Sequence, residues 1–326
     1  MLKQLLGSVK QYKKDAILTP ILVSMEVVLE VLIPLWMAYL IDFGINAGNL
    51  DYTLRTGAVL VVFAVISLSF GALAGKYAAN ASAGFARNLR QDMYYNVQNF
   101  SFANIDKFST ASLVTRLTTD VTNLQYAFQM IIRIAVRAPL MFVFSLIMAF
   151  SLNSQLSLIF LGATPFLVAG LYLIMTRVHP IFKTVFRIYD RLNNIVQENV
   201  RGIRVVKSFV REEHEKEKFG EASESIYKNF SKAEKLLVFS MPLMQSIMYV
   251  SLLLISWFGA QLIVGGSMTT GLLTSLLSYT MQILMSLMMV SMVFVMITIS
   301  RASAQRIVEV LDERTDLTTL PSQYSR

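Results

Sequence analysis

The sequence has no cysteine and only two histidines, His179 and His214. Disulfide bonds and thiolate metal sites within the chain are therefore excluded. Neither histidine has a second one at ligand spacing, so we expect no metal site. Charged residues are also few, at 15% of the 326 residues, whereas 55% are hydrophobic. This composition is unlike that of a soluble globular domain and is typical of a protein that crosses a membrane several times.

Helix-breaking residues are sparse in two long segments. No glycine interrupts residues 85–161, and residues 181–241 contain no proline and only two glycines, Gly202 and Gly220. Because Gly and Pro are the strongest helix breakers, both segments are expected to be largely helical. We expect each to continue a membrane helix well out of the bilayer, turn, and return.

Six long apolar runs are present, and most reach the roughly 20 residues that a helix needs to cross a bilayer. They lie near residues 17–41, 57–75, 134–150, 155–176, 236–264 and 271–299. The predicted fold class is therefore an all-α membrane protein with six transmembrane helices and two long cytoplasmic helical extensions.

The basic residues are sorted by this pattern. All but one of the 29 Lys and Arg residues fall in segments that the six runs place on one side of the membrane, and the exception is Arg55. Basic segments stay in the cytoplasm, so both termini are expected there. The net charge of +8 follows from this topology. The lipid bilayer is therefore an expected partner and nucleic acid is not.

The N-terminal residues 1–15 are basic and amphipathic. Leu2, Leu5, Leu6 and Val9 recur at helical spacing, which predicts a short helix on the inner membrane surface. The apolar run that follows is too long for a cleavable signal peptide. We expect a membrane domain over residues 16–305 and a linker over 306–326.

Each cytoplasmic extension contains a plausible turn, near residues 100–110 and 205–215. Turn and cap residues mix with aromatic ones there. One interpretation is an ordinary solvated hairpin. The other is a docking helix for a soluble partner, with an apolar anchor and a charged rim. The candidate docking residues are Asn104, Asp106, Lys107, Phe108, Phe209, Val210, Arg211 and Glu212.

Four stretches of the sequence resemble one family. They are residues 34–42 at the end of the first span, 112–121 after the first turn, 197–215 around the second turn, and 302–312 after the sixth span. Together they resemble the transmembrane domain of ATP-binding-cassette (ABC) exporter half-transporters over nearly the whole chain. The likeness is closest to bacterial multidrug and lipid exporters that pair two different half-transporters.

The resemblance implies that the chain forms the translocation path of an ATP-driven exporter in a bacterial plasma (inner) membrane. The implied partners are a second half-transporter, in a homo- or heterodimer, and nucleotide-binding domains that carry ATP and magnesium. The two cytoplasmic turns would be the coupling helices that dock on those domains.

Two features depart from the family pattern. Ala111 and Ser112 stand where the family usually has Gly and an acidic residue. A P-loop needs G-x-x-x-x-G-K-[ST], but at the only Gly-Lys pair, Gly75–Lys76, position 70 is Phe. No catalytic residue and no cofactor are therefore expected in this chain. The nucleotide-binding domain is expected on another chain or beyond a cut end.

Several polar residues lie within the apolar runs. Glu26 and Glu30 are four apart on one helix face, and they would line a substrate cavity or form a buried structural pair. Arg133 and Arg137 are expected to extend to the inner interface. The alternatives are that they pair with acidic residues or face the inward substrate cavity. Weaker cavity candidates are Gln245, Gln261 and Gln282. The methionines of residues 281–296 are expected to face lipid or to pack, with an adaptable drug-binding wall as the alternative.

Two other functions remain open at this point. A non-transporting module that dimerises with a full half-transporter, or regulates one, would also lack an ATPase. A passive channel or secondary carrier is disfavoured, because no inverted repeat is visible and the cytoplasmic extensions are long.

Overall fold

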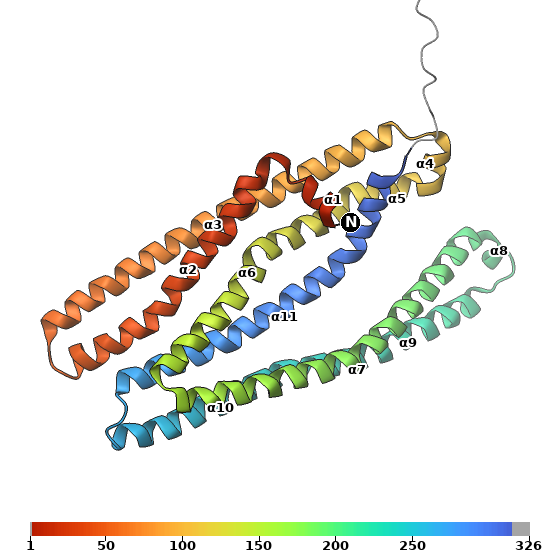
Figure 1. Ribbon diagram of the computed structural model, residues 1–326. Coiled ribbons are helices and arrows are strands. Elements are labelled where there is room, and N and C mark those ends of the chain that lie inside the picture. Colours follow the sequence, from red (N-terminus) through yellow and green to blue (C-terminus); the bar gives the residue numbers. More distant parts are fainter. Residues whose placement is uncertain (1, 315–326) are drawn as a thin grey trace, which may run out of the picture. The chain divides into compact units, whose positions relative to one another are not determined.

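The computed structural model describes residues 2–314, and Figure 1 shows its helices. Within these residues every regular element is helical. The long helices are α2 (Lys13–Tyr39), α3 (Leu50–Gln98), α6 (Val121–Leu152), α7 (Ser154–Arg201), α9 (Glu212–Val238), α10 (Ser240–Val264) and α11 (Thr270–Asp312). The short ones are α1 (Leu2–Gly7), η1 (Lys10–Tyr12), η2 (Leu40–Ile45), α4 (Phe102–Phe108), α5 (Thr110–Thr115), η3 (Arg116–Asp120) and α8 (Ile203–Ser208).

Six helical segments of the described chain are long and apolar enough to cross a membrane. The predicted fold class is thereby confirmed. Helix α3 has 49 residues, which corresponds to about 74 Å at 1.5 Å per residue. The hydrocarbon core of a bilayer is only about 30 Å thick. Such a helix must therefore continue far outside the membrane, as the shortage of helix breakers predicted.

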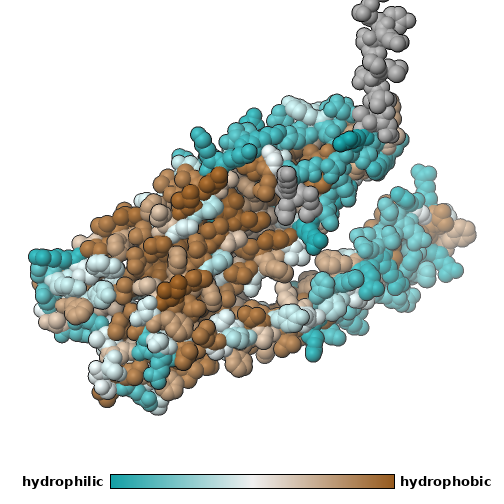
Figure 2. Space-filling model, in the orientation of Figure 1, coloured by the Kyte–Doolittle hydropathy of each residue, from teal (hydrophilic) through white to brown (hydrophobic). Residues whose placement is uncertain are grey.

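The contacts divide the chain into two units. One comprises Met1–Ser154 and Phe258–Arg326, and the other comprises Gln155–Trp257. Helices α2, α3, α6 and α11 pack together in the first unit. Helices α7 and α9 and most of α10 make up the second. In Figure 2 hydrophobic side chains cover the middle of the first unit, and hydrophilic ones gather toward its α4 end.

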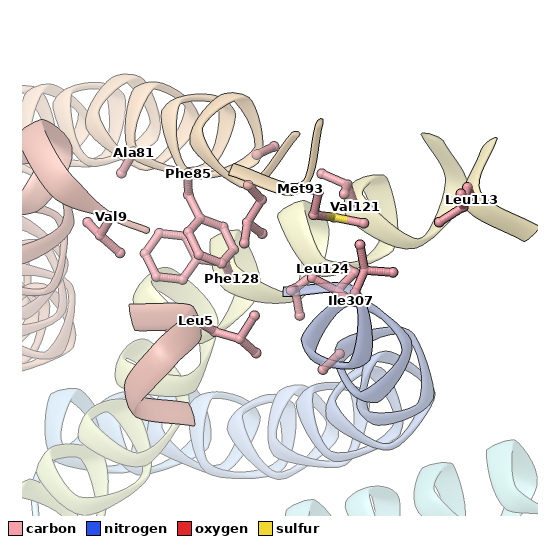
Figure 3. Close-up of a cluster of buried hydrophobic side chains, with 14 of the residues drawn as sticks. Leu5, Val9, Ala81, Phe85, Met93, Leu113, Val121, Leu124, Phe128 and Ile307 are labelled. Atoms are coloured by element: carbon pink, nitrogen blue, oxygen red, sulfur yellow. The ribbon is translucent and has the colours of Figure 1, made fainter. Parts of the chain in front are cut away.

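The core of the first unit lies at the cytoplasmic ends of its helices, by the predicted topology. Phe85 of α3 and Phe128 of α6 stack there with their ring centroids 4.6 Å apart. Leu5, Val9 and Ile307 close around this pair (Figure 3). Burial of such side chains stabilises each by about 1.5–3 kcal/mol. The N-terminal segment and α11 are thus held in one core although they lie at opposite ends of the sequence.

The N-terminal segment differs from the single amphipathic helix expected over residues 1–15. Helix α1 ends at Gly7, a 3₁₀ turn follows, and Lys10 has a positive φ of 42°. Leu5 is buried, but Leu6 is exposed. The chain turns because Tyr12 packs against α3 at Gly84, where a Cβ would collide with the tyrosine ring. Packing on α3 therefore overrides the helical period of the sequence.

Helix α11 is joined to α2 by side-chain hydrogen bonds near Pro34. Proline has no N–H, so Pro34 leaves the carbonyl of Glu30, four residues earlier, without its helical donor. Tyr279 of α11 donates to the carbonyl of Val31 (2.7 Å), and Gln282 donates to the carbonyl of Glu30 (3.4 Å). Ser275 donates to the carbonyl of Pro34 itself. Gln282 thus replaces the donor that Pro34 lacks, and all three bonds join α11 to α2.

Candidate functional site

The first of the two expected turns is the short helix α4, which has a reciprocal N-cap. Ser101 accepts a hydrogen bond from the Asn104 backbone (3.4 Å), and the Asn104 side chain accepts one from the Ser101 backbone (3.0 Å). Such a box satisfies two backbone donors at the start of a helix. Ser109, with φ 55°, ends α4 and begins the next helix. The turn expected near residues 100–110 is therefore present and sharply defined.

Helix α4 is tied to the end of α11. Asn104 donates to Oε1 of Glu313 (2.7 Å), and Lys107 Nζ binds Oε2 of the same carboxylate (2.7 Å). Asn96 donates to the carbonyls of Val310 (2.7 Å) and Glu313 (3.0 Å). The hydrogen bond from Lys107, and then that from Asn104, hold the pKa of Glu313 below its usual value. The sequence analysis did not find Glu313.

The aromatic residues of this turn have two different environments. Phe108 is only 7% exposed: it stacks on Phe100 with ring centroids 5.8 Å apart, and the Arg116 guanidinium carbon lies 5.0 Å from its ring centroid. Phe102, the first residue of α4, is 89% exposed. Asp106 and Lys107 are exposed, whereas Asn104 is only 4% exposed. Phe102 is therefore the accessible aromatic side chain of α4, and the sequence analysis missed it.

Two of the stretches that carried the family resemblance contact each other just beyond α5. Asp120 is buried and accepts hydrogen bonds from the Arg306 guanidinium (2.7 and 2.5 Å) and from Ser303 (2.9 Å). Arg116 donates to the carbonyl of Arg306 (2.7 Å) and to Glu309 (2.9 Å). Charge-assisted bonds of this kind are stronger than neutral ones. They fix the η3 segment to α11.

The second expected turn lies between α8 and α9. Phe209 and Val210 are 73% and 81% exposed, and Val210 has a positive φ of 53°. Lys207 and Glu212 form an ion pair of 2.8 Å across the turn, and Arg211 is exposed at the N-cap of α9. Two adjacent apolar side chains are therefore presented to solvent inside a charged rim.

Within the first membrane helices, Arg137 of α6 binds two acidic residues of α2, Glu26 and Glu30. Its guanidinium lies 2.7 Å from Glu26 Oε1 and 2.6 Å from Glu30 Oε2. This pairing corrects the expectation that Arg137 extends to the inner interface. Glu26 is only 8% exposed, and a Cβ at Gly71 of α3 would lie 2.7 Å from its Oε1. The glycine therefore makes room for the carboxylate. Arg133 lies beside Gly75, whose Cβ would stand 3.6 Å from its guanidinium.

The remaining polar candidates are separated. Gln282 of α11 accepts from Ser145 of α6 (2.8 Å) and donates to α2, so it contacts the same two helices that carry the charged cluster. Gln245 belongs to the second unit, where it donates to Tyr249 on its own helix (3.2 Å). Gln261 is exposed. Met281, Met285 and Met292 are also exposed.

Comparison with known proteins identifies the family. The family model for the ABC transporter transmembrane region matches residues 17–307. The chain belongs to this family. It is 31% identical over 97% of its length to the uncharacterized ABC transporter ATP-binding protein YfiB of Bacillus subtilis, and it covers 55% of that protein. An uncharacterized ABC transporter ATP-binding protein of Mycobacterium tuberculosis is 28% identical over 93% of this chain, which covers 52% of the relative.

A further relative is the ATP-dependent lipid A-core flippase of Desulfotalea psychrophila, 27% identical over 73% of this chain and 42% of its own length. The chain spans about half the length of the curated relatives that it matches. It is therefore a multi-pass ABC transporter transmembrane region. The matched range stops at residue 307, before the contact of Glu313 with α4.

Proposed function

We propose that this ABC transmembrane region forms the translocation path of an ATP-driven exporter, and that its two cytoplasmic turns dock on ATP-hydrolysing domains. The observation that carries the proposal is the exposed pair Phe209–Val210. Apolar side chains inside a charged rim are typical of the centre of a protein interface. Phe102 offers a similar anchor on α4, with Asp106 and Lys107 as its polar rim.

The topology is proposed with both termini and both turns in the cytoplasm of a bacterial plasma membrane. The sorting of basic residues supports this orientation. The membrane domain is proposed over residues 16–305, followed by a linker that lies partly outside the described residues. ATP and magnesium would bind the nucleotide-binding domains, since the sequence has no P-loop spacing. A second half-transporter would complete the path.

The charged cluster supports a structural role for Glu26 and Glu30 over a substrate-binding one. The guanidinium of Arg137 forms ion pairs with both carboxylates. A cationic substrate would have to displace that guanidinium from at least one of them. Lipid-like amphiphiles are the substrate class to test first, because one relative is named as a lipid flippase.

The test is substrate-stimulated ATP hydrolysis in proteoliposomes with the complete set of partner domains. Phe209→Ala is expected to weaken binding of the ATP-hydrolysing domain by about 30-fold or more, the level of a strong interface anchor, and to abolish stimulation. Phe186→Ala is the matched control, because Phe186 is an exposed aromatic residue of the same unit away from the turn.

Wild-type stimulation and affinity in the Phe209 variant would reject the docking role and leave a solvated hairpin. Retained docking without any transport by the wild-type complex would instead favour the regulatory module. Phe102→Ala tests the first turn in the same assay.

A further inference from the structure

Three lysines of the second unit lie on one face of α9. Lys228, Lys232 and Lys235 are spaced four and three residues apart, so they fall within an arc of about 60° around the helix. We call these three residues the lysine stripe. All three are exposed, and Ile226 and Ala233 on the opposite face of the helix are buried. The stripe therefore points away from the packed side of α9.

The lysine stripe lines a shallow hollow that is rich in hydrogen-bond donors. The hollow has a volume of about 400 Å³ and is lined by Tyr227, Lys228, Ser231, Lys232, Lys235 and Leu236. Its lining thus offers three ammonium groups and two hydroxyls, and it contains no carboxylate. A group with several negatively charged oxygens, such as a phosphate, matches this set of donors.

Within the part of the chain that the structure describes, two of these ammonium groups have no charged partner. Lys228 forms an exposed ion pair with Glu224 at 3.4 Å. Over residues 2–314, neither Lys232 nor Lys235 takes part in an ion pair. Elsewhere in the same unit, lysines farther from the apolar run are paired: Lys207 with Glu212, Lys216 with Glu213 and Lys218 with Glu198. The stripe therefore has positive charge available to a ligand.

The position of the stripe along the chain specifies what kind of ligand reaches it. Lys235 directly precedes the apolar run that begins at residue 236. Lys228 lies seven residues earlier, which is about 10 Å along the helix. The polar headgroup layer adds about 5–7 Å on each side of the hydrocarbon core. The attraction of basic residues to a charged membrane surface extends about 8 Å at physiological ionic strength. Lys232 and Lys235 therefore lie at headgroup depth, and Lys228 lies just beyond it, within reach of the field of the charged surface.

We propose that the lysine stripe binds the phosphate headgroup of an anionic phospholipid in the leaflet where α9 enters the membrane. Lys232 and Lys235 contact the headgroup, and Ser231 and Tyr227 donate to its oxygens. This role needs only the membrane position of α9, so it is independent of transport and of nucleotide-binding domains. The attraction of one lysine to an anionic surface raises the preference for anionic over neutral lipid roughly fivefold. Three lysines together raise it about a hundredfold.

The experiment uses the absence of native cysteine. Leu236→Cys in the full chain carries a single fluorophore at the membrane boundary, in bilayers of phosphatidylcholine and phosphatidylglycerol. A quencher is attached near the headgroup end of one acyl chain, in one experiment on phosphatidylcholine and in another on phosphatidylglycerol. Comparing the two degrees of quenching gives the relative association of the two lipids with this position. Lys232→Gln is expected to lower the preference for phosphatidylglycerol roughly fivefold, and replacement of all three lysines by Gln about a hundredfold.

The matched control removes the same charge elsewhere. Lys207→Gln, Lys216→Gln and Lys218→Gln together should leave the preference within twofold of wild type. Lys232→Gln breaks no ion pair of the described structure, so it tests the site even where the triple variant does not fold. An unchanged preference in both stripe variants overturns the proposal, as does an equal loss in the control.

Two further experiments test whether a ligand other than a lipid headgroup binds in the hollow. Millimolar glycerol 3-phosphate, which is soluble, should not reduce the preference. If it abolishes the preference, the site binds free phosphate esters and the lipid proposal is wrong. If the stripe variants lose chemical cross-linking between copies but keep the lipid preference, the stripe is a protein contact, which also overturns the proposal.

Discussion

Replacing Arg137 by Met should destabilise the membrane domain strongly, because two carboxylates of α2 would lose their common partner. Glu26 is buried, and the side chains of Glu30 and Arg137 are mostly shielded from solvent. At an effective dielectric constant of about 20, a contact of 2.7 Å corresponds to about 6 kcal/mol of gross attraction. Much of that is offset by desolvation of the charges, at several kcal/mol per ion.

The net change in the free energy of unfolding depends on the two carboxylates that the substitution leaves without a partner. Breaking a buried ion pair by removing one partner costs about 3–5 kcal/mol, since the other charge stays buried and unpaired. Removing all the charges together is often close to neutral. Arg137→Met combined with Glu26→Gln and Glu30→Gln should therefore recover most of the free energy of unfolding lost in Arg137→Met alone.

The assay is equilibrium unfolding in mixed detergent micelles with increasing dodecyl sulfate, followed by circular dichroism. Arg133→Met is the matched control, one helical turn away, and forms no ion pair over residues 2–314. It should change the free energy of unfolding by less than about 1 kcal/mol. An unaffected Arg137→Met variant would refute the reasoning. A triple variant no more stable than the single one would show that the carboxylates do not need the arginine.

The remaining predictions concern topology, the first turn and pH. Cysteine introduced at Asn49 should react with an impermeant reagent from outside, and cysteine at Asp106 or His214 only from inside; outside labelling of Asp106→Cys would end the six-span topology. Phe108→Ala should lower the free energy of unfolding by about 3–5 kcal/mol, as a buried aromatic residue and unlike a docking residue. The pKa of Glu313 is lowered in the folded chain, so its tie to α4 is present above the usual value of about 4.3 and is lost as pH falls through the folded value. A spin label on Asp106→Cys should become more mobile on acidification, and Glu313→Gln should make it mobile already at pH 7; an immobile label in that variant would contradict the tie.

The spans and their number could be predicted because they depend on local properties. Length, hydropathy and the sorting of basic residues are all readable along the chain. The turns were also predictable, since cap residues such as Ser101 and Asn104 act within four residues. The candidate docking residues of the second turn, Phe209 and Val210, are exposed, as a docking role requires.

Contacts between helices were not predictable from spacing. Glu26 and Glu30 share a face of α2 by helical period alone, but nothing in the sequence gives the register of α2 against α6 that brings Arg137 between them. The same holds for α4. A seven-residue helix has no period long enough to define its buried face, and packing against Phe100 and Arg116 buries Phe108 while Phe102 stays exposed. Sequence reasoning chose the wrong aromatic residue as the accessible one.

The tie between α4 and Glu313 sets the starting point of any segment that follows α11. A domain attached after this residue would be tethered at α4 and not at the membrane edge. A flexible tether of ten residues has a root-mean-square reach of about 17 Å. For a domain on such a tether, the effective concentration of α4 would therefore be in the millimolar range. Even a docking contact of weak intrinsic affinity would then stay occupied, and breaking the tie would dilute the domain without altering its binding surface.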